Sequence, residues 1–152
     1  MVESLWKPHT TVAAIAERDG KFLLVTEKVK GEIVFNQPAG HLNAGESLVE
    51  AVIRETLEET QYEFTPTALQ GIYRLVPDQD SDFTYIRYAF RGNTGANLNG
   101  KLDDGIISAE WMSYDEIKSC REHHRSPLVM QCIEDYLHRH PCPLDIFSPK
   151  FA

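Results

Sequence analysis

The segment from Ser47 to Gln61 constrains the fold of this chain most strongly, because its pattern predicts a helix with a defined start. It contains neither Pro nor Gly, and it begins with Ser47 followed by Glu50 at the third position after it. This spacing is typical of a capping box, in which the two side chains satisfy the free N–H groups of the first helical turn. We therefore expect a helix that begins just after Ser47.

The two sides of this predicted helix differ in chemistry. At 100° per residue, three glutamates share one side, and an apolar stripe follows the opposite side. The acidic set is Glu55, Glu58 and Glu59, and the stripe is Val49, Ile53 and Leu57. Leu48, Ala51 and Val52 lie on the acidic side, one to two turns earlier. A helix with apolar residues on both sides is expected to pack between layers.

Segments with the composition of β-strands lie on both sides of this helix in the sequence. The runs 10–17 and 21–25 are apolar and β-branched, and Asp19-Gly20 between them predicts a hairpin turn. Further strands are expected over 33–35, 69–76, 83–90 and 106–112, short helices over 113–119 and 127–138, and a polar loop over 91–105. Strands around a helix favour a mixed α/β layer architecture. Without repeats or a linker-like stretch, residues 1–152 are interpreted as one domain.

The composition excludes several classes of function. Apolar residues make up 42% of the chain and charged residues 25%, as in ordinary globular proteins. The 15 basic and 23 acidic residues give a net charge of −8, which disfavours binding to nucleic acid polymers or to anionic membranes. The sequence shows no apolar run of membrane-spanning length, no signal peptide and no C-x-x-C pair among its three cysteines, so a reducing cytoplasm is expected. An acidic protein that handles phosphates is expected to need a metal ion.

The three glutamates can be interpreted in two ways. Carboxylates on one helical face repel each other unless a cation lies among them, and hard oxygen ligands suit Mg²⁺ or Mn²⁺. A solvated acidic face at the end of a surface helix is the alternative, and charge-rich faces of that kind are common.

The residues before the helix favour the metal site. The run from Gly40 to Tyr62, GHLNAGESLVEAVIRETLEETQY, resembles the Nudix box. The matching positions are Gly40, Glu46, Arg54, Glu55, Glu58 and Glu59. Two positions depart from the pattern: Thr56 stands where an apolar residue is usual, and Gln61 stands where the family has Gly. These departures leave the C-terminal end of the helix uncertain and do not touch the predicted metal ligands.

The resemblance implies a fold and a set of roles. The fold is a Nudix-type α/β/α sandwich with a mixed central sheet and a catalytic loop–helix. Glu55, Glu58 and Glu59, with the carbonyl of Gly40, would bind Mg²⁺, and Mn²⁺ could replace it. Arg54 would pair with Glu46, although a surface ion pair of little consequence is the alternative. Either Glu55 or Glu58 would orient or deprotonate the attacking water.

Further motifs resemble the NudJ subgroup of bacterial Nudix phosphatases. They are KPHTTVA, GKFLLV, NQPAGHL, ESLVEA and RSPLV. This likeness implies a Mg²⁺-dependent enzyme that cleaves phosphoanhydride bonds of nucleoside di- and triphosphates and of thiamine-type pyrophosphates, with release of orthophosphate. A non-catalytic Nudix-like ligand-binding module is the alternative, and an isomerase on the same scaffold is a third. Separately, we expect the chain to be a monomer.

Four residues outside the acidic helix are candidates for contact with a small phosphorylated substrate. They are His41, Arg74, Arg87 and Arg125. The arginines carry the charge that a phosphate needs. The alternatives are strand charges that face solvent, for Arg74 and Arg87, an ordinary loop before a helix, for Arg125, and a structural hydrogen bond, for His41.

Overall fold

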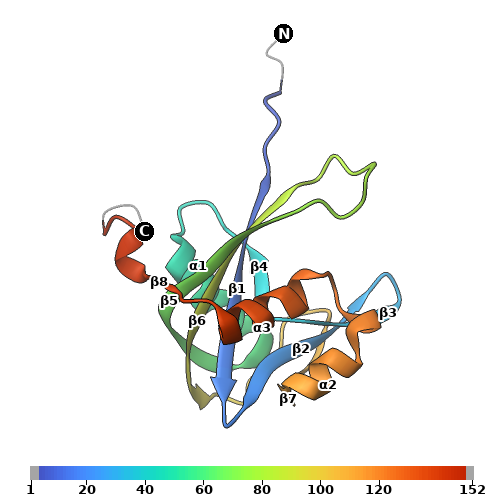
Figure 1. Cartoon of the computed structure of the whole chain (residues 1–152), viewed down its shortest axis with the longest axis vertical. Helices are drawn as coiled ribbons and strands as arrows, with labels where there is room; N and C mark the ends of the chain where they lie inside the picture. Colours follow the sequence, from blue (N-terminus) through green and yellow to red (C-terminus); the bar gives the residue numbers. More distant parts are fainter. Residues whose placement is uncertain (1–3, 150–152) are drawn as a thin grey trace.

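The computed structural model describes residues 4–149 and contains a mixed sheet with helices on both of its faces (Figure 1). The strands are β1 (His9–Arg18), β2 (Lys21–Val29), β3 (Glu32–Asn36), β4 (Ala39–His41), β5 (Tyr62–Leu75), β6 (Tyr85–Asn97), β7 (Ile106–Ser113) and β8 (Cys142–Pro143). The helices are α1 (Leu48–Thr60), α2 (Tyr114–Ser119) and α3 (Leu128–His138), with 3₁₀ turns at Arg121–His123 and Leu144–Ile146. The predicted α/β fold with a mixed central sheet is confirmed.

The sheet divides into two arms because β1 and β2 stay together only near their hairpin turn. They pair at Glu17–Phe22 and Arg18–Lys21, and Asp19 and Gly20 turn the chain with positive φ angles of 51° and 77°. Beyond the turn, β1 pairs with β4 and runs parallel to β6, whereas β2 pairs with β3 and β7. The two arms therefore separate toward the start of β1 and leave room for a cleft between them.

Each face of the sheet has its own apolar core. On one face, β1 and β2 side chains such as Ile15 and Leu24 pack against Val129 and Ile133 of α3. On the other face, Val12 and its neighbours pack against the α1 residues Ala51 and Val52. Figure 1 shows α3 crossing one face of the sheet with α1 on the other. Period-2 alternation along β1 supplies residues to both cores, which fixes its register.

Helix α1 begins as the sequence predicts but buries mainly one side, the acidic one, instead of both. Ser47 and Glu50 form both hydrogen bonds of a capping box. The buried residues are Ala51, Val52, Glu55, Thr56, Glu59 and Thr60. The expected packing of the stripe Val49, Ile53 and Leu57 is wrong for Ile53, which is exposed. The acidic side faces the protein because it carries small apolar residues as well as the glutamates.

The C-terminal end of α1 accommodates both departures from the family pattern. Gln61 adopts the left-handed conformation, with φ 61°, in which glycine is usually found. Its amide nitrogen donates to the carbonyls of Leu57 and Lys101, and its amide oxygen accepts from the N–H of Gly100. The hydroxyl of buried Thr56 donates to Val52 O at 2.7 Å. Both polar side chains are therefore satisfied, and the helix stops at Thr60.

The expectation that 91–105 forms a loop is wrong for its first part. Strand β6 continues to Asn97 and pairs with the first residues of β5, which starts at Tyr62 rather than near Leu69. The ladder contains three irregularities, between Tyr62 and Phe64, between Pro66 and Ala68, and between Leu69 and Gly71. Bulges of this kind let a strand tolerate Pro and Gly, which local patterns treat as strand breakers.

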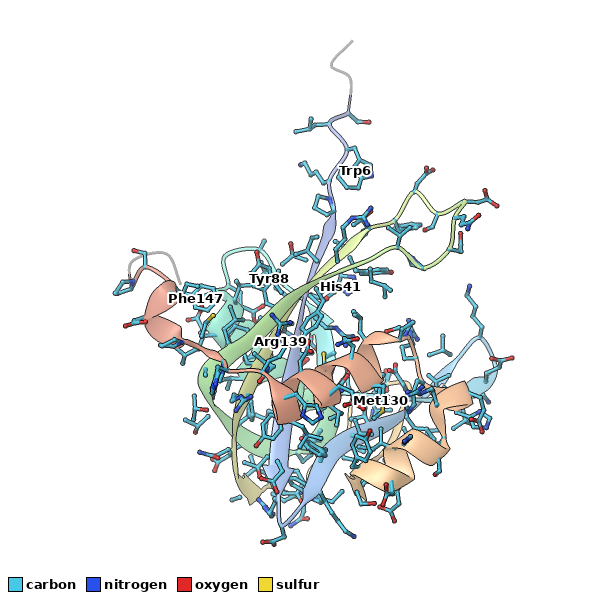
Figure 2. The ribbon with its side chains drawn as sticks, viewed as in Figure 1. Trp6, His41, Tyr88, Met130, Arg139 and Phe147 are labelled. Atoms are coloured by element: carbon cyan, nitrogen blue, oxygen red, sulfur yellow. The ribbon has the colours of Figure 1, made fainter. Side chains whose placement is uncertain are left out.

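The start of β1 and the β5–β6 hairpin extend together from the body of the molecule. Figure 2 shows Trp6 on the N-terminal segment beside this hairpin, where its indole N–H donates to Asp82 O at 3.1 Å. Within residues 4–149, no helix has the combination of length and apolar character that crossing a lipid bilayer requires.

Candidate active site

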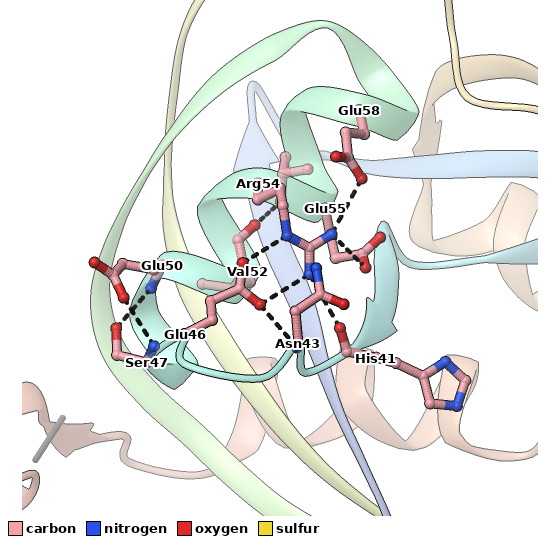
Figure 3. Close-up of polar contacts among 10 residues, drawn as sticks. His41, Asn43, Glu46, Ser47, Glu50, Val52, Arg54, Glu55 and Glu58 are labelled. Atoms are coloured by element: carbon pink, nitrogen blue, oxygen red, sulfur yellow. Dashed lines mark hydrogen bonds and ion pairs between the residues drawn. The ribbon is translucent and has the colours of Figure 1, made fainter.

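The guanidinium of Arg54 holds the predicted motif together. It donates to both carboxylate oxygens of Glu46, at 2.6 and 3.0 Å, and to the carbonyl oxygen of His41 at 3.0 Å. Its third nitrogen donates to Glu55 at 2.8 Å and to Glu58 at 3.1 Å (Figure 3). One side chain thus ties the end of β4, the loop before α1 and two turns of α1 into one geometry.

This ion-pair network shifts the pKa values of its members. Hydrogen bonding to Arg54 lowers the pKa of Glu46 and keeps it ionised. The hydrogen bond to Glu46, aided by Glu55, raises the already high pKa of Arg54. Both shifts favour the charged forms, so the pair acts as a structural clamp between the loop and the helix.

Gly40 gives Glu55 the room that its carboxylate occupies. A Cβ atom built on Gly40 would lie 2.1 Å from the carboxyl carbon of Glu55. Glu55 is nearly buried, and this burial raises its pKa although Arg54 opposes the shift. The absence of a side chain at Gly40 thus allows a carboxylate to lie directly against the backbone of β4.

The carboxylate of Glu59 forms a hydrogen bond to the backbone of the same strand, β4. It accepts the N–H of Ala39 at 3.0 Å, which lies on the edge of β4 that faces away from β1. Burial raises the pKa of Glu59 to about 8, and the negative charges of Glu55, Glu27 and Asp103 add to this shift. Ionisation of Glu59 is therefore costly here, and a neighbouring cation would stabilise the ionised form.

The donor set fits a hard divalent cation. Glu55, Glu58 and Glu59 supply carboxylate oxygens from one helix. Because Gly40 has no side chain, the backbone of β4 lies close to the carboxylate of Glu55. In the part of the chain that the structure describes, no three acidic, histidine or cysteine side chains form a ready cage for a metal. The reason is visible in the contacts, because Glu55 and Glu58 turn to Arg54 and Glu59 turns to Ala39.

A cleft of about 1210 Å³ opens on the other side of β4, between the two arms of the sheet. Gly40 and His41 form its border with the acidic helix. Its remaining lining comes from β1, β2, β3 and β6, from the residues that precede α3, and from the β5–β6 hairpin. Thus β4 separates a carboxylate cluster from a cavity large enough for a small organic molecule.

Comparison with known proteins identifies the family. The family model described as "NUDIX domain" matches residues 7–132, which is most of the chain and includes the entire motif. The chain belongs to the Nudix family. It is a Nudix hydrolase, and members of this family generally use divalent metal ions.

Three known proteins are similar to this Nudix hydrolase over nearly their whole length. Phosphatase NudJ of Escherichia coli K12 is 34% identical over 144 residues, which cover 95% of this chain and 93% of the relative. A solved Nudix hydrolase from Nitrosomonas europaea is 49% identical, with a TM-score of 0.89 and coverage of 93% of this chain and 97% of that one. The MutT protein of Methanosarcina mazei Go1 is 26% identical, with a TM-score of 0.69 and coverage of 90% and 100%.

The structure brings three of the four predicted substrate contacts to the cleft. His41, Arg87 and Arg125 line it, and Arg125 also forms an ion pair with Glu27 at 3.8 Å. Arg74 is exposed and does not line the cleft. It pairs in register with Ile86, one residue from Arg87, so its side chain points to the opposite face of the sheet.

The sequence analysis of this Nudix hydrolase assigned no role to Asn36, Gln37 and His124. Asn36 and Gln37 are buried beside Arg87, and the Nδ1 atom of His124 is buried without a hydrogen-bond partner in residues 4–149. No signal in the sequence pointed to the first two, because Asn and Gln side chains are mostly exposed. His124 had no such signal either, because its place depends on contacts with Ile117 O and on a bridge to Phe35 of β3.

We expect the substitution Arg54→Lys to impair this Nudix hydrolase although it preserves the charge. Lysine lacks the planar fork that contacts Glu46, His41, Glu55 and Glu58 at once. The expected result is a kcat at least about 10-fold lower and a melting temperature lower by a few degrees. Unchanged values in steady-state kinetics and calorimetry would show that the clamp is not needed. Arg121→Lys, at an exposed arginine outside the site, is the matched control.

Proposed function

We propose that this Nudix hydrolase is a Mg²⁺-dependent phosphatase that cleaves phosphoanhydride bonds of small phosphorylated compounds. The observation that supports this most is the position of Glu55 and Glu59, two nearly buried carboxylates whose pKa values are raised, against the backbone of β4 at the border of the cleft. Such carboxylates suit a cation that in turn faces phosphate oxygens.

The residues of the site would have three roles, which are cation binding, proton acceptance and positioning. Glu55, Glu58 and Glu59 would hold Mg²⁺ beside the backbone of β4, where Gly40 leaves room for them, and Mn²⁺ would suit the same oxygen donors. When bound, the cation would neutralise phosphate oxygens and lower the pKa of a water molecule. Glu55 or Glu58 would accept the proton of the attacking water. The clamp of Arg54 and Glu46 would keep these carboxylates in register, because each of its bonds fixes a neighbour.

The proposed substrates are nucleoside di- and triphosphates and thiamine-type pyrophosphates. The similarity to a relative named as a phosphatase supports the release of orthophosphate. His41, Arg87 and Arg125 would contact the phosphates from the cleft side of β4. We further propose that the chain acts as a monomer, as one domain over 1–152, and in the cytoplasm.

Hydrolysis is expected to require a divalent cation. The expected result is that treatment with EDTA lowers the rate of orthophosphate release by at least about 100-fold and that Mg²⁺ restores it. The measurement is a colorimetric phosphate assay on a nucleoside triphosphate, with protein stripped of metal by dialysis. Equal rates with EDTA and with Mg²⁺ would exclude metal-assisted hydrolysis, whereas no release under either condition would favour the non-catalytic module or the isomerase.

The first product from a nucleoside triphosphate is expected to be orthophosphate. The acidic motif only brings a cation beside an anhydride bond, and residues outside it decide which phosphorus is attacked. Phosphorus NMR of the reaction distinguishes the outcomes, because orthophosphate and pyrophosphate have separate signals. Pyrophosphate as the first product would mean attack at an inner phosphorus, and it would contradict the phosphatase assignment while leaving hydrolysis intact. Thiamine pyrophosphate in the same assay tests the second substrate class.

A further inference from the structure

Arg87 lies at the floor of the cleft and is almost completely shielded from solvent. It is 7% exposed, and it lines the cleft together with Thr11 and His41. Thr11 pairs in register with both Arg87 on β6 and His41 on β4, so the three residues form one row across the sheet. Directly paired residues point to the same face, which here is the face that α3 covers farther along the strands.

The guanidinium of Arg87 has only weak neutral partners. One nitrogen donates to the amide oxygen of Gln37 and another to the amide oxygen of Asn36, both at 3.4 Å. Across residues 4–149, no carboxylate forms an ion pair with Arg87, although most buried arginines have one. Gln37 is itself fixed, because its amide nitrogen donates to Val129 O at 2.8 Å.

The neighbouring ionisable groups do not compensate this charge. The buried carboxylate of Asp135 is bound by Tyr73, Gln131 and Arg139. Burial raises the pKa of the Cys132 thiol, so this side chain is neutral near pH 7. A guanidinium without a counter-charge is costly to bury, and an anion that enters the cleft would offset that cost.

The rest of the cleft lining has mainly acidic residues among its charged ones. Its acidic residues are Glu27, Glu32, Asp78, Asp80, Asp82 and Glu122. Arg125, the other arginine of the lining, is already paired with Glu27. Lys30 also lines the cleft without an ion pair in residues 4–149, but it is exposed to solvent on the turn between β2 and β3. Arg87 is therefore the buried positive charge of the cleft that lacks a counter-charge, and the acidic residues around it disfavour anions elsewhere in the lining.

We propose that Arg87, positioned by Asn36 and Gln37, forms a phosphate-binding subsite at the cleft floor. It would hold one phosphate group of the substrate on the side of β4 opposite to the carboxylates of α1, so that the phosphoanhydride chain spans the β4 border. The identification of the anion as phosphate rests on the proposed function. Asn36 and Gln37 are positioning residues, because they supply amide oxygens that orient the guanidinium without neutralising it.

The substitution Asn36→Asp tests this proposal sharply. Within the described residues, the side chain of Asn36 makes no hydrogen bond except the one from Arg87. Aspartate would keep this bond and would add the missing counter-charge. We expect the affinity for inorganic phosphate to fall by at least about 10-fold, while the melting temperature stays equal or rises. If Asn36 had only a structural role, the substitution would instead lower both the phosphate affinity and the melting temperature.

Binding is measured on metal-free full-length protein by titration with inorganic phosphate, observed by proton–nitrogen NMR. The Arg87 side-chain N–H signal, assigned by its loss in Arg87→Lys, is expected to shift with phosphate. Arg74→Met removes an arginine from the opposite face of the same sheet and is expected to leave the phosphate affinity within about twofold. This control accounts for the change in net charge.

The outcomes separate this proposal from the proposed function. If phosphate leaves the Arg87 signal unmoved, or if Asn36→Asp binds phosphate as tightly as the parent protein, the subsite is wrong even when hydrolysis proceeds. If phosphate binds at Arg87 and Asn36→Asp abolishes the binding, the subsite is supported. This result would stand even if the Mg²⁺-dependent release of orthophosphate failed.

Discussion

Replacing Glu58 or Glu59 by glutamine is expected to lower kcat by about 100-fold or more while the protein stays folded. The amide retains the shape of the carboxylate but removes the charge that a divalent cation needs. Glu59 makes the sharper case, because its carboxylate already accepts the N–H of Ala39 and an amide oxygen can accept the same bond. The measurement is steady-state phosphate release at saturating Mg²⁺.

The stability of Glu59→Gln separates a functional loss from a structural one. Burial and three negative neighbours raise the pKa of Glu59, so a neutral amide is less costly to bury than the carboxylate. The melting temperature of the metal-free protein is therefore not expected to fall. Glu63→Gln removes the same charge from an exposed position on β5 and should retain full activity. Full activity in Glu58→Gln and Glu59→Gln would mean that these carboxylates form only an acidic face.

Features that depend on neighbours in the chain could be predicted from the sequence. The Asp19-Gly20 turn and the capping box of Ser47 and Glu50 need only local backbone geometry, and both are present. The same is true of helices α2 and α3, whose predicted ranges match within one residue at the N-terminus. Local patterns suffice in these places because the stabilising hydrogen bonds join residues a few positions apart.

Features that depend on distant pairing could not be predicted in this way. Residues 91–97 contain Gly92, Asn93, Gly95 and Asn97, which favour a loop by local propensity. They are nevertheless strand, because the start of β5 pairs with them. The Gly92 position also needs a small residue, since a Cβ there would lie 2.3 Å from Thr65 O. The ladder thus overrides the propensity of its residues.

The candidate site shows the same division. The spacing of Glu46, Arg54 and Glu55 could be recognised in the sequence, but the bond from Arg54 to His41 O depends on where β4 ends. The partners of Arg87 lie about fifty positions away in sequence, at Asn36 and Gln37. Nothing in the local pattern distinguished Arg87 from Arg74, because only the register of β5 and β6 determines which arginine faces the cleft.

Substituting Gly40 by alanine is expected to lower kcat by about 100-fold through Glu55. The new methyl group would lie 2.1 Å from the carboxyl carbon of Glu55, and no backbone atom is among its nearest contacts. Since Glu55 can rotate away, the fold should survive with a loss of about 1 kcal/mol for the broken bond to Arg54, or about 3 °C in melting temperature. A displaced carboxylate, in contrast, misplaces whatever it binds, and a shift of about 1 Å can cost about 100-fold in rate.

A double-mutant cycle tests whether Gly40→Ala acts through Glu55. If displacement of Glu55 is the entire effect, Gly40→Ala should reduce kcat little further in a Glu55→Gln background, where the carboxylate is already lost. Gly95→Ala is the matched control, because its methyl group would meet the end of Glu63 at 3.1 Å, far from the site. Losses that multiply in the double mutant would show that Gly40 contributes independently of Glu55.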